Sequence, residues 1–227
     1  FGGAEVTGDN HLGDWGTQFG MVIAALEEKG DQEAEMGVSE LERIYVDYNQ
    51  RAREDEKLLE KAREAFVRLE KGEKEARKIW EWVVDKSRQE FERVYQILGI
   101  RIDHAFGESA YEKTMEEVIK EVEEKGLLKK SEGAKIIEFE DLPPAMLIKS
   151  NGTTTYFTRD LATIKFRQET PELRSDLYIY EVGAEQSLHF RQVFAAVEKL
   201  GWGKKEDFVH VAHGFILGKD GKKMSTR

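Results

Sequence analysis

Apolar residues recur at helical spacing through residues 38–99, a stretch without proline in which acidic and basic residues alternate in nearly equal numbers. Glu64 precedes Arg68 by four residues, and Glu70 precedes Lys74 in the same way, which is the favourable order of charges on a helix face. This pattern predicts two or three long helices that form a hairpin-like insert. We interpret its charges as solvated helix faces. The apolar positions that set the period are Leu58, Leu59, Ala62, Ala65, Phe66, Leu69, Trp80, Val83, Val84, Phe91, Val94, Tyr95 and Leu98.

Shorter elements flank this insert. Residues 4–9 are predicted to form a short strand, followed by a glycine-rich turn and a helix over residues 15–29. Residues 111–125 have the period of a second amphipathic helix, which Gly126 is expected to end as a C-cap. Residues 135–140 then read as a strand.

The dipeptide Asn151-Gly152 lies between two runs of apolar and β-branched residues, 145–149 and 153–158. Asn-Gly in this setting is the strongest short-range signal for a β-hairpin, because both residues accept positive φ. We therefore predict a hairpin whose two strands are these runs.

The last third of the chain alternates between strand and helix patterns. Residues 177–182 form an apolar run that predicts a buried strand, residues 187–200 have helical spacing, and residues 208–212 predict a second strand. This order is that of a βαβ unit in a parallel sheet. Ligands of such sheets bind at the carboxyl ends of the strands, so residues 183–186 and 213–217 are expected near a site.

The predicted fold class is therefore α/β, with a Rossmann-like parallel sheet and a mostly helical insertion. The 227 residues suffice for one large domain with an inserted subdomain. We expect three regions: residues 1–37, a mainly helical insertion over 38–135, and residues 136–227. The chain opens at Phe1 rather than methionine and closes in a lysine-rich loop, so both ends are expected to be cuts within a larger protein.

Composition narrows the classes of protein. The formal net charge is −10, which argues against tight, non-specific nucleic-acid binding but leaves room for a local basic patch. Cysteine is absent, which excludes disulfides and thiolate metal sites and favours a reducing cytoplasm. No apolar run approaches the ~18 residues of a membrane span, so no membrane association is expected.

The final segment, residues 214–227, reads G-F-I-L-G-K-D-G-K-K-M-S-T-R. Glycines allow close backbone approach to a polyphosphate, and lysines neutralise its charge. On composition alone, a solvated hairpin tip is the more probable interpretation. However, the tetrapeptide from Lys223 to Thr226 resembles the KMSKS loop of class I aminoacyl-tRNA synthetases, whose lysines contact the ATP phosphates. Thr226 stands where that pattern has its second lysine, so Lys223 is the catalytic cation we expect, with Lys222 as its substitute.

Residues 11–20, H-L-G-D-W-G-T-Q-F-G, resemble a segment that arginyl-tRNA synthetases carry after their first nucleotide-binding motif. Taken alone, Asp14 is expected to cap the following helix. Trp15 is the better functional candidate, because a flat ring at a turn can wall a nucleotide or tRNA-end pocket. The His-Ile-Gly-His signature of the class is absent from this chain.

Residues 156–161, Y-F-T-R-D-L, resemble the arginine-pocket segment of the same family. A guanidinium is a planar fork of five donors whose best complement is a carboxylate with added neutral acceptors. Asp160 would supply the carboxylate and Tyr156 a phenol oxygen. The alternative is that Tyr156 packs in the sheet and Asp160 caps the next helix.

Residues 183–189, G-A-E-Q-S-L-H, resemble the Gly-x-Asp/Glu-Gln turn of class I synthetases. Gln186 would hydrogen-bond the substrate's guanidinium or hold its α-ammonium group. His189, one helical turn later, faces the same way. A lone histidine on an amphipathic helix is more often a satisfied core residue, so His189 is a weaker candidate.

These four segments, in this order, resemble arginyl-tRNA synthetase across essentially the whole chain. The resemblance implies that residues 1–37 are part of a nucleotide-binding fold and that residues 136–227 are the second half of this catalytic fold, ending in the KMSKS-like loop. The resemblance implies that the parent enzyme uses ATP with Mg²⁺ to activate L-arginine as arginyl-adenylate and then transfers it to tRNA(Arg), as a monomeric, cytoplasmic enzyme of protein biosynthesis without a protein-bound metal. The chain alone, without the His-Ile-Gly-His half-site and the tRNA-binding domains, is expected to be inactive. The residues expected to bind ATP are Trp15, Gly183, His213, Gly214, Phe215, Lys223, Met224 and Ser225.

Two other interpretations remain open. Another class I synthetase is one, although a cysteinyl enzyme would need zinc-binding cysteines and a glutamyl enzyme a cation at position 160. A non-catalytic synthetase-like interaction module is the other. Such a module would need neither the Lys223 loop nor an acidic amino-acid pocket.

Overall fold

The structure is a computed structural model that describes residues 2–30, 36–215, 217–219 and 221. The chain divides into two compact units, one up to Gly107 and one from Glu108 onward. Each unit is built around its own apolar interior. No helix among the described residues is long and apolar enough to cross a membrane.

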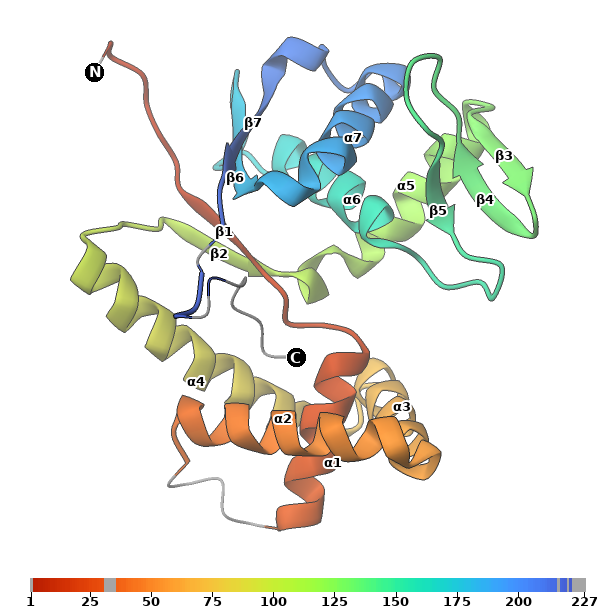
Figure 1. The fold of residues 1–227 in the computed structure, drawn as a ribbon. Helices are drawn as coiled ribbons and strands as arrows, with labels where there is room; N and C mark the ends of the chain where they lie inside the picture. The colour runs from red at the N-terminus through yellow and green to blue at the C-terminus, as the bar shows by residue number, and fades with distance from the viewer. Residues whose placement is uncertain (1, 31–35, 216, 220, 222–227) are drawn as a thin grey trace. The chain divides into compact units, whose positions relative to one another are not determined.

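The first unit is dominated by helices α1 (Thr17–Lys29), α2 (Val38–Glu54), α3 (Glu56–Glu70) and α4 (Lys74–Leu98) (Figure 1). The prediction of two or three long helices over residues 38–99 is confirmed, since α2, α3 and α4 fill that stretch. Their apolar faces pack together because each helix carries its buried residues at helical spacing.

Helices α1 and α3 approach each other very closely. A Cβ atom added at Gly20 would lie 2.1 Å from the backbone oxygen of Ala62 and 2.9 Å from the Cβ of Phe66. Ala62 and Ala65 are completely buried on the facing side of α3. Small residues on both helices therefore bring their backbones together.

Strand β1 (Asp9–Leu12) pairs in parallel with β2 (His104–Gly107), from Asp9 opposite His104 to Leu12 opposite Gly107. The predicted strand over residues 4–9 is thus placed too early. The pairing partner decides the position, because β2 meets the chain only from Asp9 onward. Val6, within the predicted strand, is 82% exposed.

In the second unit, helix α5 (Glu112–Glu124) follows a short 3₁₀ turn, η2 (Glu108–Tyr111), and precedes a three-stranded antiparallel sheet. The predicted helix over residues 111–125 is confirmed, and Gly126 adopts the left-handed conformation (φ 67°) expected of a C-terminal glycine. The sheet is built from β3 (Leu128–Ser131), β4 (Ala134–Ile137) and β5 (Ala145–Ile148).

The predicted hairpin across Asn151-Gly152 is only half correct. Its first run forms β5, but the second run gives a single bridge, between Ile148 and Thr154, and then enters helix α6 (Tyr156–Glu169). The buried positions of this helix, Phe157, Leu161 and Ile164, follow the helical period. Burial of that face in the unit's core overrides the β-propensity of the threonines.

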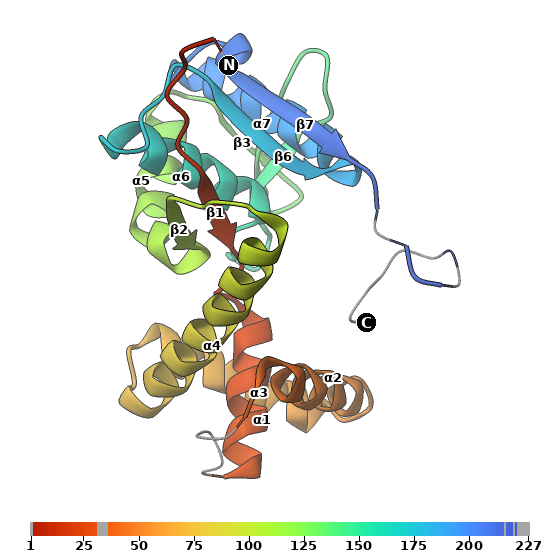
Figure 2. The same cartoon turned by 90° about the vertical axis from the view of Figure 1, so that its left-hand side faces the viewer.

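The βαβ prediction is confirmed. Strand β6 (Tyr178–Gly183) leads through the 3₁₀ turn η3 (Ala184–Gln186) into helix α7 (Ser187–Leu200), and the turn η4 (Lys205–Asp207) leads into the parallel strand β7 (Phe208–His213). Figure 2 shows α7 running behind the two strands.

The strands of this unit are buried on one face only, which corrects the expectation of a fully buried β6. Tyr178 and Phe208 are 9% and 4% exposed, whereas the next residues, Ile179 and Val209, are 62% and 39% exposed. The side chains alternate because successive residues of a strand point to opposite faces. Phe190 and Phe194 of α7 cover the inner face.

Candidate functional site

The carboxyl ends of β6 and β7 lie side by side, with Gly183 directly opposite His213 in the register. A Cβ atom at position 183 would lie 2.3 Å from the Glu185 carboxylate, which is the end of a flexible side chain and can move aside. The ring of His213 donates from Nδ1 to the carbonyl oxygen of Gly214 at 2.9 Å. The predicted site residues Gly183, His213 and Gly214 therefore lie at one edge of the strand pair, where ligands of parallel sheets bind.

The chain beyond β7 leaves this edge with exposed apolar residues. Phe215 is 49% exposed and Leu217 is 56% exposed. The predicted phosphate-loop residues that follow, Lys222, Lys223, Met224 and Ser225, lie outside the described residues.

Helix α6 presents the two residues predicted to bind a guanidinium. Tyr156 is its first residue and is 65% exposed, and Asp160 lies four residues later on the same helix face with its side chain 23% exposed. The alternative roles are not observed. Tyr156 does not pack in a sheet, and Asp160 lies inside α6, whose N-cap is Thr155.

Two threonines anchor the start of α6 on strand β5. Thr155 Oγ1 donates to the carbonyl oxygen of Met146 at 2.5 Å, and Thr158 Oγ1 donates to that of Leu147 at 2.6 Å. Thr158 is completely buried. These bonds fix the first turn of the helix, and with it the positions of Tyr156 and Asp160.

His189 lies against Asp160, with Nε2 at 2.5 Å from Oδ2. Each side chain is 23% exposed, so the contact is shielded from most solvent. It links α6 to the first turn of α7. His189 was the weaker candidate in the sequence, where it resembles a lone core histidine, because its partner lies 29 residues away and only the fold brings the two together.

Arg159 lies beside the candidate site and was not among the predicted site residues. Its guanidinium lies 5.3 Å from the centre of the Tyr156 ring, and its Nη1 is 3.4 Å from Oε2 of the nearly buried Glu108. The cation therefore lies between a fixed acid and the aromatic ring. The spacing of Tyr156 and Arg159, three residues apart on a helix, is a signal that could have indicated this contact.

Gln186 is exposed and forms the N-cap of α7, one helical turn before His189. The first turn of α7 thus carries both residues of the predicted Gln-x-x-His pattern.

Beneath α6, burial raises the pKa of Tyr180 to about 12, an effect that nearby Arg167 reduces in part. A phenol is neutral at physiological pH even at its ordinary pKa, and the raised pKa keeps Tyr180 neutral in more alkaline solution as well.

Trp15 lies in the helical core of the first unit. It is 7% exposed and packs edge-on against Phe66 and Trp80, with the guanidinium of Arg77 at 5.5 Å from its ring centre. Packing is the role that the structure gives this ring, in place of the pocket wall we expected.

Asp14 does not cap helix α1, contrary to our prediction. The N-cap is Gly16, and no side chain makes a capping bond there. The Asp14 carboxylate instead lies against the Cα of Gly107, where an added Cβ would come within 1.8 Å of Oδ2. Its backbone oxygen accepts a hydrogen bond from Trp80 Nε1 at 2.7 Å.

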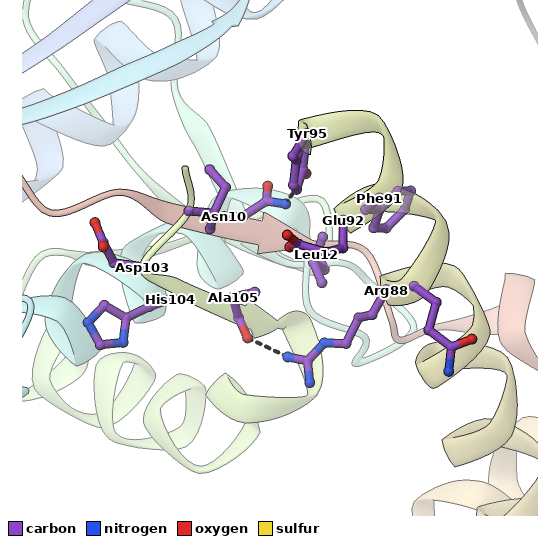
Figure 3. A pocket seen from close by; sticks show the side chains of 11 residues that line it. Asn10, Leu12, Arg88, Phe91, Glu92, Tyr95, Asp103, His104 and Ala105 are labelled. Atoms are coloured by element: carbon purple, nitrogen blue, oxygen red, sulfur yellow. Dashed lines mark hydrogen bonds between the residues drawn. The ribbon is translucent and has the colours of Figure 1, made fainter. Parts of the chain in front are cut away.

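A separate pocket of about 470 Å³ lies in the first unit between the β1–β2 pair and α4 (Figure 3). Leu12, Phe91 and Tyr95 contribute much of its apolar wall. Its polar groups are engaged with the protein itself: Arg88 Nη2 donates to the Ala105 oxygen at 2.5 Å, and Asn10 Nδ2 donates to Tyr95 Oη at 2.5 Å. None of the predicted site residues lines it, so we assign it no part in the chemistry.

The described residues include no group of three or more histidine, cysteine, aspartate or glutamate side chains arranged to hold a metal ion.

Comparisons with known proteins agree with this geometry. The family model described as tRNA synthetases class I (R), catalytic domain, matches residues 1–227. An arginine–tRNA ligase of Chloroflexus aggregans is 43% identical over 228 residues, covering 99% of this chain and 39% of that protein. Arginine–tRNA ligase 2 of Bacillus anthracis is 44% identical over 229 residues, with coverage of 99% and 40%.

Solved structures give the same result. The arginyl-tRNA synthetase of Plasmodium falciparum superimposes with a TM-score of 0.75 at 28% identity, covering 92% of this chain and 36% of that one. The Thermus thermophilus enzyme shares the fold, with a TM-score of 0.74 over 97% of this chain at 21% identity. The chain spans 39–40% of the length of the two ligases named above. The chain belongs to the catalytic-domain family of class I arginyl-tRNA synthetases.

Proposed function

We propose that the full-length protein is an arginine–tRNA ligase, which activates L-arginine with ATP and transfers it to tRNA(Arg). The observation that carries this proposal is the placement of Asp160 beside the first turn of α7, directly after the carboxyl end of β6. A carboxylate is thereby positioned next to the sheet edge where a nucleotide binds in folds of this class.

The amino-acid side of the site would be formed by helices α6 and α7. Asp160 would accept hydrogen bonds from the guanidinium, and Tyr156 would add a neutral phenol oxygen. Gln186 would hydrogen-bond the guanidinium or hold the α-ammonium group of the substrate. A carboxylate with neutral acceptors complements the planar five-donor fork of arginine better than it does the point charge of lysine.

The nucleotide side would lie at the carboxyl ends of β6 and β7. Gly183 and His213 are neighbours there, and the backbone of Gly214 and Phe215 continues from the edge. The glycine allows close approach of a ligand to the backbone. Lys222 and Lys223, with Met224 and Ser225, would follow in the loop that contacts the phosphates.

The chemistry requires positioning and charge stabilisation rather than a protein nucleophile. The arginine carboxylate attacks the α-phosphorus of ATP, the bond to the pyrophosphate oxygen breaks, and arginyl-adenylate forms. A hydroxyl of the terminal adenosine of tRNA then attacks the activated carbonyl carbon and AMP leaves. Lys223 would stabilise the negative charge that develops on the phosphates in the first step, with Mg²⁺ bound to the phosphates.

Charging of tRNA by the purified full-length protein tests this proposal. Labelled arginine should become attached to tRNA(Arg) in an ATP-dependent reaction that releases AMP and pyrophosphate. Absence of charging in an otherwise folded protein would contradict the ligase assignment and favour a non-catalytic synthetase-like module. A cytoplasmic location is part of the same proposal, because tRNA charging serves translation there.

A further inference from the structure

We propose that His189 is a positioning residue that acts through Asp160: it fixes the carboxylate so that its second oxygen faces the arginine substrate. This inference rests on the proposed function, since it concerns how the same site reads a guanidinium. It assigns a role to a histidine that the sequence pattern favours as a core residue.

The first argument is the hydrogen bond itself. His189 Nε2 lies 2.5 Å from Asp160 Oδ2. A carboxylate only accepts hydrogen bonds, so Nε2 carries the proton and donates it. The contact engages Oδ2, and a carboxylate has about four lone-pair sites, so Oδ1 retains its capacity to accept from a substrate.

The second argument is that the histidine ring is itself held. Phe157 contacts it edge-on with ring centres 6.3 Å apart, and Phe190 does so at 5.5 Å. Both phenylalanines are 4% exposed and belong to the core of the unit. A ring clamped between two core residues on different helices is a rigid support for a ligand-binding carboxylate.

The third argument concerns the freedom that Asp160 would otherwise have. Its side chain is partly exposed, at 23%, and a partly exposed carboxylate samples several rotamers in water. Fixing one oxygen removes that freedom before the substrate arrives, and preorganisation of this kind lowers the entropic cost of binding. The effect should therefore appear in arginine binding and leave the chemical step unchanged.

The test uses pyrophosphate exchange by the full-length protein in the presence of tRNA(Arg). His189→Ala should raise the KM for arginine about tenfold, the scale of one hydrogen bond to a charged group. The kcat and the KM for ATP should remain within about twofold. His189→Gln, whose amide nitrogen can occupy the place of Nε2, should recover most of the loss.

A double-mutant cycle decides whether His189 acts through Asp160. If it does, adding His189→Ala to Asp160→Asn should change arginine kcat/KM by less than about twofold, because the charged partner is already gone. A full, multiplicative effect of His189→Ala in that background would overturn the inference. So would an unchanged arginine KM in the single variant.

His210 provides a matched control. His210 is half-buried and, like His189, packs on Phe190, with ring centres 4.9 Å apart. Its Nε2, however, donates to the Val182 backbone oxygen at 2.9 Å. His210→Ala should lower the melting temperature without raising the arginine KM. An equal rise in both histidine variants would mean general loosening around α7 and would overturn the inference. Absence of arginine-dependent exchange in the wild type would instead refute the proposed function.

Discussion

Asp160 is the residue on which the proposed amino-acid site depends most. It is the acid that meets the first turn of α7, and its partner there is the imidazole of His189 rather than a lysine or arginine. The carboxylate is therefore not committed to a permanent cation of the protein. The guanidinium of a substrate can therefore serve as the cation that pairs with Asp160.

Asp160→Asn should raise the KM for arginine about 100-fold in the full-length protein, which corresponds to about 2.7 kcal/mol. The variant keeps the shape of the side chain and one acceptor oxygen but removes the charge. The KM for ATP should change far less, because the proposed nucleotide edge is built from other residues. Pyrophosphate exchange kinetics measure both constants.

Glu169→Gln is the matched control, since Glu169 ends the same helix, away from Asp160. Its Oε1 pairs with Lys165 Nζ at 2.9 Å. It should leave the arginine KM unaltered. An unaltered arginine KM in Asp160→Asn, together with a normal melting temperature, would exclude Asp160 as the substrate ligand.

Lys223→Ala should lower kcat for pyrophosphate exchange by at least ~10²-fold, the usual scale for loss of one charge-stabilising donor. This prediction rests on the sequence pattern, because Lys223 lies outside the described residues. The double variant of Lys222 and Lys223 separates the two lysines. A wild-type exchange rate in both variants would show that the loop does not act on the phosphates.

At the residue scale, the spacing of residues along the sequence predicted which side chains share a helix face, but it did not predict contacts between residues far apart in the chain. The four-residue interval between Tyr156 and Asp160 already places both on one helix face. The contacts of Asp160 with His189 and of Arg159 with Glu108 join residues 29 and 51 positions apart, and no periodicity encodes them. Trp15 was misjudged because a tryptophan at a glycine turn suits either a pocket wall or a core.

At the scale of elements, the contact between α1 and α3 offers a direct test of packing. Gly20→Ala should destabilise the protein by about 1–3 kcal/mol, even though alanine favours a helix by up to ~1 kcal/mol, because the new methyl group would overlap the Ala62 backbone oxygen. Urea denaturation followed by tryptophan fluorescence measures the change.

Gly13→Ala is the control, because an added Cβ there meets no atom within 4 Å. It should shift the free energy of unfolding by less than about 0.5 kcal/mol. If Gly20→Ala were equally mild, the close approach of the two helices would be wrong.

The elements that the sequence predicted well are those defined by their own periodicity. Helices α2 to α4, α5 and α7 carry apolar faces that a single segment reveals. Strands depend on partners elsewhere in the chain, so β1 was placed too early and the run after Asn151-Gly152 was assigned as a strand although it enters α6. Burial of Phe157, Leu161 and Ile164 against the unit's core decided the latter case.

At the scale of the whole molecule, the α/β class and the βαβ order of the last third followed from the alternation of patterns along the chain. The exposure of the outer face of β6 and β7 could not be predicted from that alternation. Strand β6 was predicted to be fully buried, yet Ile179 is 62% exposed, and Glu181, two residues later on the same face, is exposed as well. Parallel sheets are normally covered on both faces, which is why this segment was predicted as a buried strand.

The central claim is that a carboxylate in this chain selects arginine by its charge. Pyrophosphate exchange by the full-length protein with tRNA(Arg), using arginine and its uncharged analogue citrulline as alternative substrates, tests it most directly. A site with a charged partner should favour arginine in kcat/KM by at least ~10³-fold, and Asp160→Asn should narrow that ratio. Comparable exchange with citrulline and arginine in the wild-type protein would contradict the account.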